Sequence, residues 1–197
     1  MSRTLNCPFD KDYWPLMQAT VFAVHACGLD PRCATEADDP GEERLEKISR
    51  IIGSCRYSIH DLSRKGPDPV SGLSRFNMPF ELGLCLGARR YGHRPKSLLV
   101  METAPFDYHA FLSDFAGRDV KHHGDDPAKV INHVRTWLNA QSLGWALPGG
   151  IALQRSYEAL HKELPVMLEK AHLDETEITF VDWSHLLEQW FAAPPPT

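Results

Sequence analysis

Short apolar runs alternate with longer amphipathic segments through residues 1–145 of the chain. Residues 42–55 place apolar side chains three and four positions apart, which is the pattern of one helix face. Residues 96–102 (KSLLVME) form a nearly continuous apolar run, which is typical of a strand buried on both faces. The pattern predicts strands at 3–7, 31–35, 56–63, 96–102 and 118–123. It predicts helices at 13–27, 42–55, 77–91, 106–115 and 127–138.

Regular alternation of strands and helices favours a parallel sheet with right-handed crossovers. We therefore expect an α/β fold with an open parallel five-stranded sheet and helices on both faces.

The alternation stops at residues 147–150 (LPGG). Helical patterns follow at 151–173, broken or kinked near Pro165, and at 184–191. We expect these helices to pack on the main domain or on a second subunit, because Trp183, Trp190 and Phe191 need a partner surface. The predicted organisation is an α/β domain at 1–145, a helical C-terminal extension at 146–191 and a disordered tail at 192–197.

Charge and cysteine content narrow the classes of partner. The net charge is −5 over 197 residues, which argues against nucleic acid or an anionic membrane as the partner. No apolar run approaches the thickness of a bilayer, and the first ten residues do not resemble a signal peptide. The five cysteines include no CxxC pair, so we expect free thiols in a reducing cytoplasm and no metal site.

Polar and aromatic residues gather where three predicted strands or loops lead into helices. In an open parallel sheet, ligands bind beyond the carboxyl ends of the strands, where the strand order reverses. Residues 6–13, 60–64 and 75–81 should meet there. The candidate ligand-binding residues are Asn6, Pro8, Phe9, Asp10, His60, Asp61, Ser63, Phe76, Asn77 and Met78.

Glu81 is the candidate catalytic residue. It is the one acidic group in a helix that is otherwise apolar until Arg89. If Asn77 caps this helix, Glu81 lies about one turn inside it, where the positive end of the helix dipole favours an ionised carboxylate. A partly sheltered carboxylate facing a crevice can act as a nucleophile or stabilise a cationic sugar centre.

Simpler structural roles remain open for these residues. Glu81 could only compensate the dipole or pair with a nearby arginine. Asp61 could cap a turn with Ser63, and Asp10 could cap the first helix. His60 is more simply explained as a structural histidine than as an acid or base.

The segments NCPFDKDY, RYSIHDLS and RFNMPFELGLCLG together resemble an uncharacterised bacterial group related to nucleoside 2-deoxyribosyltransferases and Toll/interleukin-receptor (TIR) domains. In deoxyribosyltransferases the corresponding helix carries an FE.G motif whose glutamate attacks the sugar, and PFELG matches it at Glu81. An acidic residue that contacts the sugar follows the preceding strand in those enzymes, and Asp61 is at the matching position. Residues 77–79 (NMP) replace the Gly-Thr pair that precedes the glutamate there.

The resemblance implies a flavodoxin-like or TIR-like sheet and cleavage or transfer of an N-glycosidic bond in a nucleotide, with NAD hydrolysis favoured. Glu81 would then stabilise or capture the cationic sugar, Asp61 would orient the ribose hydroxyls, and an aromatic ring near Phe9 or Phe76 would hold the leaving ring. No cofactor is expected besides the substrate nucleotide. The implied setting is bacterial defence, with a homo-oligomer or another defence protein as partner. Two alternatives stay open: a nucleotide-binding sensor without activity, and a TIR-like interaction module.

Overall fold

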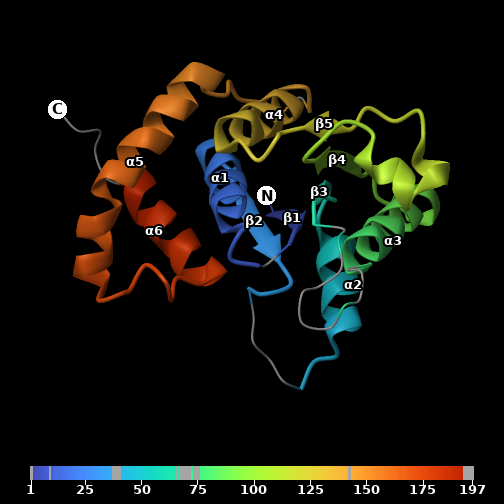
Figure 1. Cartoon of the computed structure of the whole chain (residues 1–197), viewed down its shortest axis with the longest axis horizontal. Helices are drawn as coiled ribbons and strands as arrows, with labels where there is room; N and C mark the ends of the chain where they lie inside the picture. The colour runs from blue at the N-terminus through green and yellow to red at the C-terminus, as the bar shows by residue number, and fades with distance from the viewer. Residues whose placement is uncertain are drawn as a thin grey trace.

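The computed structural model describes residues 2–8, 10–36, 41–64, 66, 72, 76–141 and 143–192. Its centre is an open sheet of five parallel strands in the order β2-β1-β3-β4-β5 (Figure 1). The strands are β1 (Ser2–Asn6), β2 (Asp30–Cys33), β3 (Tyr57–Asp61), β4 (Ser97–Glu102) and β5 (Lys121–His122). The predicted fold class is therefore confirmed.

Helices cover both faces of the sheet, as Figure 1 shows. They are α1 (Trp14–Ala26), α2 (Arg44–Ser54), α3 (Asn77–Tyr91), α4 (Pro127–Asn139), α5 (Gly150–Ala171) and α6 (Phe180–Ala192). Helices α1 and α4 pack together on one face, and α2 and α3 pack together on the other. Helices α5 and α6 form a further layer outside α1 and α4.

Local sequence explains how several helices begin and which side they bury. The Asp126 side chain caps α4 by accepting a hydrogen bond from the Ala128 N–H at 2.8 Å, and Pro127 occupies the first turn, where no backbone donor is lost. Helix α2 buries Ile48, Ile51 and Ile52 together with Lys47, while Leu45 and its other residues face solvent.

Three elements differ from the prediction. Helix α5 continues through Pro165, so the predicted break does not occur there. Pro165 is exposed, so water can replace the hydrogen bond that proline removes. Residues 106–115 form two short 3-10 helices, η1 (Asp107–Ala110) and η2 (Ser113–Phe115), in place of one helix. Helix α6 starts at Phe180, because Asp182 and Thr179 cap its first turn.

The C-terminal helices share the main hydrophobic core with the sheet domain. Trp183 of α6 is fully buried, and its indole N–H donates to the Gln18 carbonyl of α1 at 3.2 Å. The Phe191 and Phe22 rings lie 5.6 Å apart. The extension is thus anchored to α1 by both packing and a hydrogen bond. The predicted tail falls largely on residues 193–197, which lie outside the described residues.

Among the helices of the described ranges, none has the length and hydropathy needed to span a bilayer.

Candidate functional site

Strands β1 and β3 are neighbours at the centre of the sheet, and the chain leaves them toward opposite faces. Helix α1 follows β1 on one face, whereas α3 follows β3 on the other. This is the switch point at which open α/β sheets bind ligands. Asn6 and His60 are register partners near the carboxyl ends of the two strands. The candidate site is therefore built around their carboxyl ends.

A buried hydrogen-bond network joins three of the predicted residues at this switch point. The Asn6 side-chain amide donates to His60 Nδ1 at 2.9 Å and to the Met78 carbonyl at 3.1 Å. Because the amide reaches a carbonyl as well, its nitrogen is the donor in both bonds. The network holds the first turn of α3 against the end of β1.

His60 is neutral in this network. Complete burial lowers the pKa of His60 to about 3, since a charged imidazolium would lose its hydration. With Nδ1 accepting from Asn6, the ring proton lies on Nε2, which has no hydrogen-bond partner among the described residues. The Asn6 Oδ1 atom is likewise unpaired within that set. His60 is therefore unsuited to proton transfer near neutral pH.

Glu81 is more buried than the sequence suggested, with 6% of its surface exposed. Burial raises the pKa of Glu81 from 4.5 to about 6, and the positive charge of Arg44 on α2 partly opposes the rise. The expected stabilisation by the helix dipole does not dominate. Asn77 is also not the cap that was predicted, because it is the first helical residue and the N-cap residue is Phe76, without a side-chain hydrogen bond.

Glu81 lies close enough to the end of β1 to interact electrostatically with Cys7. Its negative charge helps to raise the pKa of the Cys7 thiol, after the larger effects of burial, Cys33 and Asp61. Cys7 directly follows β1. Glu81 therefore lies within electrostatic reach of both the switch point and Arg44, and at pKa about 6 its carboxylate is mostly ionised at neutral pH.

Asp61 makes the turn with Ser63, which is the simpler of its two expected roles. The Ser63 N–H donates to Asp61 Oδ1 at 2.9 Å, and the Ser63 hydroxyl donates to the same oxygen. His123 Nε2 lies 3.1 Å from Asp61 Oδ2. Burial opposes ionisation of Asp61, but hydrogen bonds from His123 and Ser63 outweigh it and lower its pKa. Asp61 is thus a buried carboxylate that is already engaged by two protein groups.

Ser63, His123 and Asp61 do not form a nucleophilic triad, although all three side chains meet. Such a triad needs the serine and the carboxylate on different ring nitrogens. Here His123 Nδ1 accepts from the Asp125 N–H at 3.0 Å, while Ser63 and Asp61 both face Nε2, at 2.9 and 3.1 Å. With Nδ1 accepting, the ring proton lies on Nε2, so the ring cannot accept a proton from Ser63 at that nitrogen.

Sequence reasoning missed two residues at this edge of the sheet. His123 directly follows β5 and is fully buried. Glu102 ends β4, is fully buried, and accepts hydrogen bonds from the Phe106 N–H at 2.9 Å and the Tyr108 N–H at 2.8 Å. These bonds hold Phe106 in a left-handed conformation with φ of 65°. An acidic residue closing a buried strand was the available signal for Glu102.

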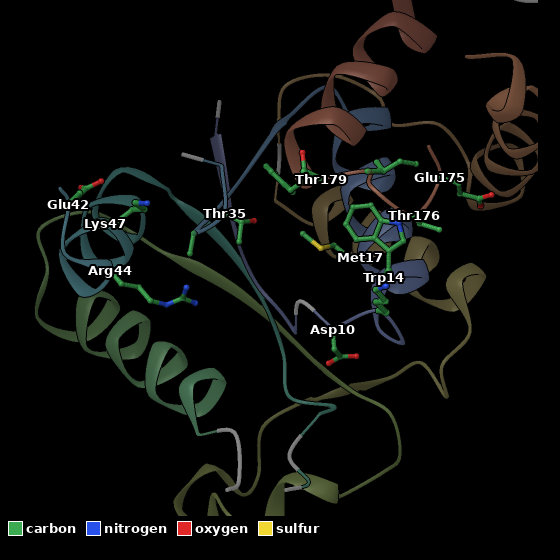
Figure 2. Close-up of a pocket in the computed structure, with 14 residues that line it drawn as sticks. Asp10, Trp14, Met17, Thr35, Glu42, Arg44, Lys47, Glu175, Thr176 and Thr179 are labelled. Carbon is green, nitrogen blue, oxygen red and sulfur yellow. The ribbon is translucent and has the colours of Figure 1, made fainter. Parts of the chain in front are cut away.

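A cavity of about 780 Å³ opens beside the switch point (Figure 2). Its lining comes from the start of α1, the segment after β2, the start of α2 and the connection between α5 and α6. Asp10 is the predicted site residue that lines it, and the Arg44 side chain, which acts on Glu81, lines it as well. Glu81, Asp61 and His60 are not part of this lining.

The other predicted residues are more scattered. Pro8 is buried after β1, whereas Phe76 is 62% exposed at the start of α3. Asp10 accepts a hydrogen bond from the Tyr13 N–H at 3.0 Å and lies 3.8 Å from Arg64, so it shapes the turn before α1. Phe9 lies outside the described residues.

No protein-family model matches this sequence, and no curated protein shows significant similarity to it.

Proposed function

We propose that the protein cleaves the N-glycosidic bond of a nucleotide, with NAD as the leading substrate and Glu81 as the catalytic carboxylate. The observation that carries the proposal is a buried carboxylate with a pKa of about 6 at the switch point of a parallel sheet. Carboxylates with perturbed pKa in such positions are candidates for catalysis.

The reaction needs a negative charge close to the sugar. As the C1–N bond breaks, the leaving ring takes both bonding electrons, so nicotinamide departs neutral and positive charge develops on the ribose. Glu81 stabilises the positive ribose of the transition state more than it stabilises the bound nucleotide before the bond breaks. This difference lowers the barrier. Water then bonds to C1 and releases its proton to solvent, giving ADP-ribose. Because the carboxylate must be ionised, kcat/KM rises with pH through about 6.

Asp61 acts indirectly in this proposal. Its oxygens are held by Ser63 and His123, so it keeps a fixed negative charge near the ribose and need not contact the hydroxyls as the family resemblance implied.

The test is base release from NAD and from a panel of nucleosides, followed by chromatography. We expect Glu81→Gln to lose turnover by at least about a hundredfold while staying folded. Glu163→Gln is the matched control, because Glu163 is exposed on α5. If no base is released from any of these compounds by the wild-type protein, the glycosidase proposal is wrong.

A nucleotide-binding module without turnover is the second candidate. It is favoured by the cavity itself, whose lining contains Arg44 and Trp14 but not Glu81. A sensor would bind nucleotide and leave it intact, and Glu81→Gln would then change affinity alone. An interaction module would be nearly indifferent to the substitution in both assays.

A further inference from the structure

The 780 Å³ cavity is formed jointly by the sheet domain and the C-terminal extension. On one side, Arg44 extends from α2 toward the middle of the space, as Figure 2 shows. On the other side lie Trp14 of α1 and the connection between α5 and α6, represented by Glu175 and Thr179. Its volume falls in the range of small-molecule sites, roughly 300–1,000 Å³.

The side contributed by the extension is held in place by short hydrogen bonds. The Thr176 N–H and hydroxyl both donate to Asp174 Oδ1, at 2.8 and 2.6 Å. The Thr179 N–H and hydroxyl donate to Asp182 Oδ2, at 2.9 and 2.6 Å. Trp183, one residue further along α6, is buried against α1. The cavity is therefore preformed, and binding need not order this connection.

Charge is unevenly distributed around the cavity. Two of its acidic residues already face cations: Glu42 accepts two hydrogen bonds from Arg50, at 3.0 and 2.9 Å, and Asp10 lies 3.8 Å from Arg64. Arg44 has no ion pair within 4 Å among the described residues. Positive charge thus remains available on the α2 side, while Glu175 places negative charge on the extension side.

We propose that this cavity binds a phosphorylated ring compound of the nucleotide class, with the phosphate on Arg44, the ring against Trp14, and the C-terminal extension as the opposite side of the site. A guanidinium presents paired N–H donors that match phosphate oxygens. An indole offers a flat face for a base. The choice of a nucleotide rests on the proposed function, whereas the requirement for phosphate rests on the cavity alone.

Binding is measured by isothermal titration of the full chain with AMP, adenosine and inorganic phosphate. We expect AMP to bind at least about tenfold more tightly than adenosine, because a charged hydrogen-bonded phosphate adds to the ring contact. Arg44→Gln should weaken AMP binding by about ten- to a hundredfold and leave adenosine binding nearly unchanged. Arg155→Gln, an exposed position on α5, is the matched control and should bind AMP as the wild type does.

The contribution of the extension has its own test. Glu175→Gln removes a negative charge from the side facing Arg44 and should strengthen AMP binding a fewfold, with a smaller effect at high salt. Unchanged or weaker binding in this variant would refute the role of the extension.

Two results would refute the proposed site. One is equal affinity for AMP and adenosine. The other is an Arg44→Gln variant that is folded by circular dichroism and binds AMP as the wild type does. Phosphate-dependent binding without base release from NAD would retain the site and reject the glycosidase.

Discussion

Replacing Glu81 with glutamine should stabilise the protein at neutral pH while removing its proposed activity. The substitution keeps the size and shape of the side chain and removes the charge. Burial makes ionisation of Glu81 unfavourable, as its pKa of about 6 against an ordinary 4.5 shows. Glutamine at this position avoids that cost.

The magnitude follows from the pKa difference. A rise of about 1.5 units corresponds to roughly 2 kcal/mol. The folded state binds the Glu81 proton more tightly than the unfolded state does. Proton binding at Glu81 therefore stabilises the fold fully below about pH 4.5, and this stabilisation is lost as the pH rises through about 6. Wild-type and Glu81→Gln proteins should therefore be similar near pH 4, and the variant should be about 2 kcal/mol more stable near pH 7.5.

Urea denaturation at both pH values measures this difference. At neutral pH the variant should also melt about 4–8 °C higher, given the usual dependence of Tm on stability for a chain of this size. Other groups whose pKa differs between the folded and unfolded states, such as His60, contribute equally to both proteins and cancel in the comparison.

Glu163→Gln serves as the control and should change stability by less than about 0.5 kcal/mol at either pH. A Glu81→Gln protein that is less stable than the wild type near pH 7.5 would show that the carboxylate gains more from its neighbours than burial costs. The assignment of Glu81 as a desolvated, activated carboxylate would then be wrong.

Three further results are expected. The His60 ring protons should keep constant NMR chemical shifts from about pH 8 to pH 5, because burial keeps the imidazole neutral; a titration midpoint near 6.5 would contradict this. His123→Ala should cost about 1–3 kcal/mol in urea denaturation at neutral pH, since it leaves the buried Asp61 carboxylate without the His123 ring beside it, and the double variant with Asp61→Asn should recover part of the loss. Trp183→Ala should cost about 3–5 kcal/mol by loosening α6 from α1, and an unchanged Tm would mean that the extension does not share the core.

The periodicity of apolar residues was sufficient to predict the sheet domain. Strands buried on both faces appear as continuous apolar runs, and helices against one face appear at three- and four-residue spacing, so the signal is local. The same local signal marked Glu81 as an isolated carboxylate in an apolar helix. The helix 127–138 was likewise predictable, because Asp126 and Pro127 are adjacent in the chain to the residues they cap.

The local sequence did not predict the N-cap residue of α3 correctly. Asn77 is a good capping residue by type, but it is the first helical residue, and Phe76 occupies the cap position without a side-chain hydrogen bond. Residue type alone therefore does not fix the position at which a helix begins.

What the sequence determined by itself is the class of fold and the presence of one isolated acidic group in an apolar helix, since both are encoded in the pattern of apolar and polar residues at neighbouring positions of the chain. Tertiary structure alone decided the surroundings of that group. His123 meets Ser63 across 60 positions of sequence, Arg44 comes to Glu81 from a different helix, and the extension lines a cavity begun by α1 and α2. Burial and electrostatic fields sum over all neighbours in space, so no local pattern carries them.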